Sequence, residues 1–261
     1  MESQVILLLW NKGVDMHWNI VGAGRIGLAL VKMADGNSTL FHRNDSLQNL
    51  KEGPIVLCVR NDDLADIIPL LPKERHRDCI FVQNGMLQSW LIEHGLENCT
   101  QSLLYFAVAK RGDEPVDGGR TVTMGKWALE FQELLQKGNI QSEVVSKKVF
   151  DVSMCSKYLW ICVMSVLCDY YQCDVGTVLY KHSDSIRELT AECSTIVAKH
   201  TGIALSDQLY KELNDYTRTI PHYRCSVKEW KWRNGWLWKR EPSILHQRFL
   251  GDMIQKYENK S

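Results

Sequence analysis

Residues 17–27 read HWNIVGAGRIG and place a short apolar strand directly before three closely spaced glycines. The apolar residues 28–33 are typical of a helix, so the segment predicts a strand, a glycine turn and a helix in that order. Each glycine has its own steric role in such a turn. Gly22 allows the tight turn, Gly24 lets the backbone approach a ligand, and Gly27 lets the helix pack closely on the strand.

The free amides at the start of such a helix carry a partial positive charge and bind phosphate groups. A strand, glycine turn and helix near the start of a chain therefore favour a dinucleotide-binding fold, and a glycine turn that binds nothing is the alternative. The residues that we expect to contact a bound pyrophosphate are Gly22, Ala23, Gly24, Arg25, Ile26 and Gly27.

The charge of the whole chain is balanced, with 31 Lys and Arg against 31 Asp and Glu among 261 residues. A net charge of zero argues against a nucleic-acid partner or a membrane surface, so we expect phosphate binding to be local. The early apolar run 5–10 is much shorter than the roughly 20 residues of a membrane span. We expect neither a signal peptide nor an anchor, and residues 1–16 form a tail before the first strand.

The nine cysteines contain no Cys-x-x-Cys pair and lie mostly in apolar segments. An odd number of cysteines without close pairing is typical of free, buried thiols in a reducing compartment and not of a zinc site. We therefore expect a cytoplasmic protein with no metal centre.

The end of the second predicted strand, residues 38–41, indicates which dinucleotide is favoured. An acidic residue at this point would accept hydrogen bonds from a ribose and favour NAD, whereas an arginine pairs with the additional phosphate of NADP. The sequence continues with His42, Arg43 and Asn44. We expect NADP as the cofactor, with Arg43 binding its phosphate and His42 or Asn44 assisting; a solvated loop cation is the alternative for Arg43.

Two further apolar runs, residues 54–59 and 78–82, have strand length and enclose a helical segment, 62–68. Uninterrupted apolar runs suit parallel strands that are buried on both faces, so the order predicts a doubly wound parallel sheet. The polar residues after such strands face the cofactor crevice, although Asn-Gly is also a common turn dipeptide. The candidates there are Arg60, Gln83 and Asn84.

With these motifs the chain resembles the ketopantoate reductase family, whose NADP-dependent enzymes combine a Rossmann domain with a helical domain. The family carries the three-glycine turn, an arginine after the second strand, a basic residue after the third and Gln-Asn-Gly after the fourth. In this chain the basic residue is Arg60, where the family usually has lysine. The resemblance implies further strands at 102–107, 120–125 and 142–145 and a helix at 126–136.

The second half begins with a long apolar segment without Gly or Pro, residues 152–171, which predicts a buried helix. The family resembled here has a lysine near the start of this helix, which implies Lys157 as general acid for the alkoxide formed when a ketone is reduced. We expect burial to lower the pKa of Lys157; a lysine that extends to solvent is the alternative. The family's asparagines one and two turns later are replaced by Ile161 and Ser165.

Residues 229–239 read EWKWRNGWLWK and admit two structures. The resemblance implies a helix in which Glu229 binds substrate, whereas Asn-Gly between alternating tryptophans and cations is also a hairpin signal. The hairpin would pair Arg233 with Trp236 and Lys231 with Trp238. We favour the helix, because residues 243–250 resemble the family's closing helix.

Together these observations predict a Rossmann domain over residues 15–150 and an all-α domain over 151–261 that binds substrate and forms a homodimer. The expected activity is NADP-dependent hydride transfer to a small 2-oxo acid or similar carbonyl compound, with Lys157 as proton donor and Glu229 and Asn84 positioning the substrate. The alternative is a catalytically inactive NADP(H)-binding redox sensor or protein-interaction module, which the loss of the asparagines and an exposed tryptophan patch would favour.

Overall fold

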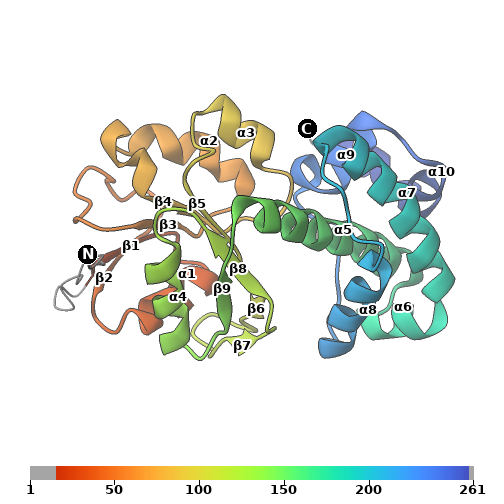
Figure 1. Ribbon diagram of the computed structural model, residues 1–261, viewed down its shortest axis with the longest axis horizontal. Helices are drawn as coiled ribbons and strands as arrows, with labels where there is room; N and C mark the ends of the chain where they lie inside the picture. The colour runs from red at the N-terminus through yellow and green to blue at the C-terminus, as the bar shows by residue number, and fades with distance from the viewer. Residues whose placement is uncertain (1–15, 259–261) are drawn as a thin grey trace, which may run out of the picture.

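The computed structural model describes residues 16–258, so all but the last residue of the predicted N-terminal tail lies outside the described part. It consists of a sheet half, residues 16–146, and a helical half, residues 147–258 (Figure 1). The predicted domain boundary at residue 150 falls within the first turn of the long helix that joins the two halves.

The sheet half alternates strands with helices along the chain. Its main sheet has seven strands in the order β2-β1-β3-β4-β5-β8-β9. These strands are β1 Trp18–Val21, β2 Ser38–Phe41, β3 Ile55–Leu57, β4 Cys79–Phe81, β5 Thr100–Leu103, β8 Thr121–Met124 and β9 Ser142–Val144. A separate pair consists of β6 Phe106–Ala107 and β7 Val116–Asp117. The α-helices are α1 Arg25–Met33, α2 Leu64–Ile67, α3 Gln88–Glu93 and α4 Ala128–Lys137, and the 3₁₀ helices are η1 Asn61–Asp63, η2 Ile68–Leu70 and η3 Lys73–Asp78.

Both faces of the sheet are buried because helices cover each of them (Figure 1). Successive residues of a strand point to opposite faces, so Ile20 packs in the cluster that contains α1 and α4 while Val21 packs in the cluster that contains α2 and α3. The same alternation holds for Val56 and Leu57 in β3. The predicted strands without polar alternation are therefore confirmed as the interior of an α/β fold.

The sheet is dominated by parallel pairs, as predicted, but its last two strands run the other way. Strands β1 to β5 are parallel to their neighbours, whereas β8 pairs antiparallel with β5 and β9 follows β8 in parallel. The chain makes this reversal after β5 through the small β6–β7 pair, which replaces a crossover helix.

The helical half is built around α5, Lys147–Tyr171, which starts just after β9 and extends into the other helices (Figure 1). The Ser146 side chain caps α5 by accepting a hydrogen bond from the Val149 amide. By length and composition α5 could cross a membrane, but 67% of its most apolar window is buried inside the protein, as in the core helix of a folded domain. The surrounding helices are α6 Val175–Lys181, α7 Ser183–Thr201, α8 Leu209–Thr219, α9 Asn234–Arg240, α10 Ile244–Leu250 and α11 Met253–Glu258.

The tryptophan-rich segment is helical, so the hairpin alternative is wrong. It forms the 3₁₀ helix η4, Trp230–Trp232, followed directly by α9. Helical spacing brings the Arg240 guanidinium to 3.7 Å from the centre of the Trp236 ring, in place of the pairs that a hairpin would form. Trp230, Trp232 and Trp236 are buried, so an exposed tryptophan patch is also contradicted.

All nine cysteines are free, and seven of them are buried, as the sequence predicted. Burial raises the pKa of the Cys58, Cys155 and Cys162 thiols to about 12. These thiols are therefore protonated at neutral pH and behave as small apolar side chains.

Candidate active site

The glycine turn has the geometry that its sequence predicted. Gly22 has a φ of +110°, and a Cβ atom there would lie 2.6 Å from the Cys58 carbonyl oxygen. A Cβ atom at Gly27 would lie only 1.9 Å from the Gly22 carbonyl oxygen. Gly24, the residue before α1, differs, since no protein atom lies within 4 Å of its Cβ position. The fold itself therefore requires Gly22 and Gly27, whereas the space beside Gly24 is free for a ligand.

The other predicted residues of the turn have separate surroundings. Ala23 lines the cleft described below, and Ile26 packs against the core beside α1. The Arg25 guanidinium donates hydrogen bonds to the carbonyl oxygens of Val108 and Ala109 at 3.1 and 3.3 Å. The Arg25 side chain thus holds the segment after β6, and only its backbone belongs to the phosphate-facing end of α1.

A cleft of about 1170 Å³ opens at the carboxyl ends of β1, β2 and β3. Its wall includes Gly22, Ala23 and Gly24 on one side and the segments after β2 and β3 on the other. The basic side chains in its lining are His42, Arg43, Arg60 and Arg111, and the acidic ones are Asp45, Asp63 and Asp66. Predicted cofactor residues from three separate loops are therefore brought together at one opening.

Arg43 is highly exposed, with 84% of its side chain accessible. Its guanidinium lies 3.8 Å from Asp63, a distance that leaves most of its donors free. The backbone of the neighbouring His42 donates a 2.7 Å hydrogen bond to Asp45, which closes the turn after β2. This exposed cation at the end of β2 can pair with a ligand phosphate.

Arg111 is a cleft residue that the sequence reading missed. It belongs to the segment between β6 and β7, which Lys32 ties to α1 through hydrogen bonds to Gly112 at 2.6 Å and Glu114 at 2.8 Å. Together with the Arg25 contacts, these bonds bring the segment to the cleft. The β6–β7 pair and these long-range bonds place Arg111 there, and nothing in the local sequence signals it.

Gln83 and Asn84 do not line this cleft, and Gln83 lines a separate small pocket. The Gln83 amide donates hydrogen bonds to the Leu57 and Val59 carbonyl oxygens at 2.6 and 3.1 Å, which joins β4 to the end of β3. The Asn84 carbonyl oxygen accepts a hydrogen bond from the buried Asn61 amide at 2.9 Å. Among residues 16–258, no hydrogen bond or ion pair joins the Asn84 side chain to Lys157 or Glu229.

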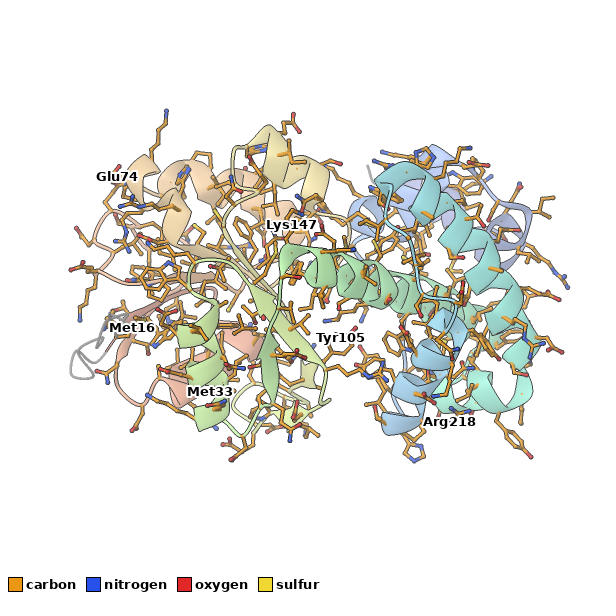
Figure 2. All side chains as sticks on the ribbon, viewed as in Figure 1. Met16, Met33, Glu74, Tyr105, Lys147 and Arg218 are labelled. Atoms are coloured by element: carbon orange, nitrogen blue, oxygen red, sulfur yellow. The ribbon has the colours of Figure 1, made fainter. Side chains whose placement is uncertain are left out.

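Lys157 is buried ten residues after the start of α5, nearly three turns into the helix, and the residue is 7% exposed. Its ammonium group donates a 2.5 Å hydrogen bond to the Leu104 carbonyl oxygen and lies 4.3 Å from the centre of the Tyr105 ring. Figure 2 shows Tyr105 in the sheet half on the side that faces the helical half. Burial, with repulsion from the Arg233 charge, lowers the pKa of Lys157 from 10.5 to about 7. Lys157 can therefore gain or lose a proton near neutral pH.

Glu229 forms an ion pair with Arg233, four residues later in the chain. Arg233 in turn lies close enough to Lys157 for its charge to lower the pKa of that lysine. From sequence, Arg233 has a role only in the hairpin, which the structure contradicts. No local pattern pairs it with a lysine 76 positions earlier, since tertiary contacts such as the hydrogen bond from the Tyr158 hydroxyl to the Arg233 carbonyl oxygen bring this segment to α5.

The two positions where asparagines were expected have different surroundings. Ile161 is buried and carries no hydrogen-bonding group. The Ser165 hydroxyl accepts a 3.1 Å hydrogen bond from the Asn234 amide, whose oxygen lies 3.0 Å from the His246 ring. Burial lowers the pKa of His246 to about 4, so this group is neutral at physiological pH. Ser165 and Asn234 are therefore engaged in a buried structural network.

The arrangement offers a cleft for an elongated phosphate-bearing ligand and a buried amine with a pKa near neutrality. Among the described residues, no group of three or more His, Cys, Asp or Glu side chains is placed to hold a metal ion. The chemistry that these groups can perform is thus the binding of phosphate, the binding of an anion and the transfer of a proton.

Comparisons with known proteins agree with this description. Residues 150–229 match the family described as "Ketopantoate reductase PanE/ApbA C terminal". No curated protein matches the sequence of the chain. The fold is similar to that of a PanE/ApbA family ketopantoate reductase from Ralstonia eutropha JMP134, with 17% identity, a TM-score of 0.69 and coverage of 94% of this chain and 99% of that one.

Two further solved structures have the same fold. One is a dimeric ketopantoate reductase from Staphylococcus aureus, with 16% identity, a TM-score of 0.71 and coverage of 94% of this chain and 100% of that one. The other is D-mandelate dehydrogenase in complex with NADH, with 15% identity, a TM-score of 0.68 and coverage of 94% and 99%. At these identities the likeness establishes the fold. The predicted resemblance to ketopantoate reductases is confirmed in this fold and in the sequence of residues 150–229.

Proposed function

We propose that this chain, which has the fold of the ketopantoate reductases, is an NADP-dependent oxidoreductase that reduces a small 2-oxo acid or similar carbonyl compound. The observation that carries the proposal is the pairing of two features. The first is the open space beside Gly24 at the start of α1, and the second is the buried Lys157 amine with its pKa near 7. A protein that bound nucleotide only for stability would have no need of such an amine.

A dinucleotide fits the residues that are present. The free amides of α1 follow Gly24, where a side chain would occupy space that no protein atom fills. The cleft of about 1170 Å³ is large enough for an extended cofactor. Gly22, Ala23 and Gly24 would hold the pyrophosphate, and His42 and Arg43 the adenosine end.

The choice of NADP over NAD is supported by the charges at the end of β2. His42 and Arg43 follow the strand directly, where an enzyme that selects NAD has an acidic residue. Arg60 and Arg111 add two more cations to the same cleft. The fold does not decide this choice, since D-mandelate dehydrogenase was solved with NADH.

The bound nicotinamide would supply the hydride that adds to the substrate carbonyl carbon. The ammonium group of Lys157 then gives its proton to the carbonyl oxygen, which becomes a hydroxyl group. Its positive charge also stabilises negative charge on that oxygen in the transition state. A pKa near 7 suits this role, because both the protonated and the neutral amine are populated at working pH. Glu229, and Asn84 if the loop after β4 moves toward the substrate, would orient the substrate.

The proposal extends to location and assembly. A cytoplasmic location is supported by the free, mostly buried thiols, which suit a reducing compartment. A homodimer is supported by the dimeric Staphylococcus aureus enzyme of the same fold.

A catalytically inactive NADP(H)-binding module is the second candidate. Ile161 favours it, because this buried apolar side chain stands where a hydrogen-bonding residue was expected. An exposed tryptophan patch does not support it, since the tryptophans of residues 230–236 are buried.

The proposed cofactor is tested by titrating the protein with NADPH and NADH while tryptophan fluorescence is recorded. We expect Arg43→Ala to weaken NADPH binding by about tenfold to a hundredfold, the value of one charge-assisted hydrogen bond, and to leave NADH binding unchanged. Arg77→Ala, which removes an exposed arginine outside the cleft, is the matched control. Failure of the native protein to bind either nucleotide would refute the proposal.

Catalysis is tested by following NADPH absorbance with a panel of 2-oxo acids. We expect Lys157→Met to reduce turnover by about a hundredfold or more while NADPH still binds. Nucleotide binding without turnover on any compound of the panel would instead favour the inactive module.

A further inference from the structure

The substrate side of the site lacks a hydrogen-bonding group on α5 one turn after Lys157. The residue there is Ile161, which lies on the same face of the helix as Lys157 because four residues make about one turn. A 2-oxo acid carries a carboxylate directly beside its carbonyl group. If Lys157 serves the carbonyl oxygen, a donor for the carboxylate has to come from another element.

Arg233 reaches this turn of α5 from the tryptophan-rich segment. Its charge acts on both Lys157 and Cys162, which lie on either side of Ile161 in the sequence. The Arg233 backbone is held against the same turn, because its carbonyl oxygen accepts a 2.8 Å hydrogen bond from the Tyr158 hydroxyl. The guanidinium therefore lies near the place that a hydrogen-bonding side chain at position 161 would serve.

Arg233 also has a neighbour in common with a residue of the sheet half. Burial raises the pKa of Tyr223, and the charges of Arg233 and Arg25 both oppose that rise. Arg25 belongs to the glycine turn of the sheet half, and Arg233 to the helical half. One guanidinium from each half is thus close enough to Tyr223 for its charge to act on that phenol.

The charged groups around Arg233 carry a net positive charge, which favours the binding of an anion. Lys157 and Arg233 together carry two positive charges when Lys157 is protonated, and Glu229 is the ion-pair partner of Arg233. A guanidinium has five N–H donors. In Arg233, one of them donates a hydrogen bond to the Glu229 carboxylate. The buried Nε of Arg233 has no partner among the described residues. A carboxylate would supply both the missing charge and the missing acceptors.

We propose that Arg233 is the residue that binds the carboxylate of the substrate, with Glu229 holding its guanidinium in place and Lys157 serving the adjacent carbonyl oxygen. This inference rests on the proposed reductase function and deepens it. The site then selects compounds with a carboxylate beside the carbonyl group over neutral compounds of the same shape. Glu229 becomes a positioning residue that acts through Arg233.

The inference is tested with oxamate and oxamide, two small molecules of nearly equal shape that differ by one negative charge. Their binding is measured by tryptophan fluorescence and ligand-observed NMR, with and without NADPH. We expect the native protein to bind oxamate more tightly, and Arg233→Gln to weaken oxamate binding by about tenfold to a hundredfold. We expect oxamide binding to be unchanged. Arg240→Gln is the matched control, because Arg240 lies in the same segment but stacks on Trp236.

Two further measurements keep the test decisive. Arg233→Gln leaves Glu229 partly buried without its partner, so the double variant Glu229→Gln/Arg233→Gln, which removes both charges, is tested if the single variant unfolds. NADPH titration of each variant reports on the proposed function separately. Native protein that does not distinguish oxamate from oxamide, or variants that bind oxamate as the native protein does, would overturn the role of Arg233 whether or not NADPH binds.

Discussion

A methyl group added at Gly27 should lower the stability of the protein, whereas one added at Gly24 should weaken nucleotide binding. At Gly27 a Cβ atom would lie 1.9 Å from the Gly22 carbonyl oxygen, so the start of α1 must move more than 1 Å away from the turn. Forcing extra atoms into a packed site typically costs about 1–3 kcal/mol, and we expect the upper value because the clash is with backbone. Such a loss lowers the melting temperature of a chain of this size by about 6–12 °C.

At Gly24 the same methyl group meets no protein atom within 4 Å, and the φ of −79° is ordinary for alanine. We therefore expect Gly24→Ala to change the free energy of unfolding by less than about 1 kcal/mol, since a weaker helix cap is offset by a less flexible unfolded chain. The methyl group would instead occupy the space proposed for the pyrophosphate. The loss of one charge-assisted hydrogen bond weakens NADPH binding by about tenfold to a hundredfold.

The assay combines thermal unfolding by circular dichroism with NADPH titration by tryptophan fluorescence on both variants. The expected result is a stable Gly24→Ala protein with impaired nucleotide binding and an unstable Gly27→Ala protein. Unchanged NADPH affinity in Gly24→Ala would refute the placement of the pyrophosphate. Unchanged melting of Gly27→Ala would refute the packing argument.

Three further predictions concern stability. Because Lys157 has a folded pKa of about 7 against 10.5 when unfolded, its own contribution to native stability rises by a few kcal/mol between these pH values, and the difference in free energy of unfolding between the native protein and Lys157→Met in urea titrations should shift by that amount. Trp232→Ala should lower the free energy of unfolding by about 3–5 kcal/mol in the same assay, whereas the less buried Trp238→Ala should lower it less. The lowered pKa of His246 predicts that native stability declines as pH falls from 6.5 to about 4. Because Phe cannot be protonated, thermal melts of His246→Phe should show a smaller decline over this pH range. An equal decline would contradict this assignment.

The first four strands of the sheet could be predicted to within two residues because each is a short run that ends in apolar residues and is followed by a turn or polar residues. The direction of β8 and β9 could not, since burial of a strand does not reveal which neighbour it pairs with. The start of α5 was placed five residues late at 152, although Ser146 is a good helix cap and could have indicated the true start.

Some residues of the candidate site could likewise be predicted from local sequence, and others could not. The glycine turn and the exposed Arg43 follow from local sequence, because a strand, a turn and a helix are contiguous in the chain. Arg111 and Arg233 do not, because each is brought to its site by packing between segments far apart in sequence. In residues 229–239 the tryptophan spacing fits both a strand and a helix, and tertiary contacts such as the Trp232 hydrogen bond to Asp62 favour the helix.

Trp232 has a consequence for how the chain unfolds and how it can be divided. Although it belongs to the helical half, its indole lies in the core cluster of the sheet half and donates a 2.6 Å hydrogen bond to Asp62. A recombinant fragment ending after β9 would lack the side chain that completes this core, leaving a hole the size of an indole. The covalent link through α5, this inserted ring and the hydrogen bond from Lys157 to Leu104 join the halves at separate points, so we expect them to melt in a single cooperative transition.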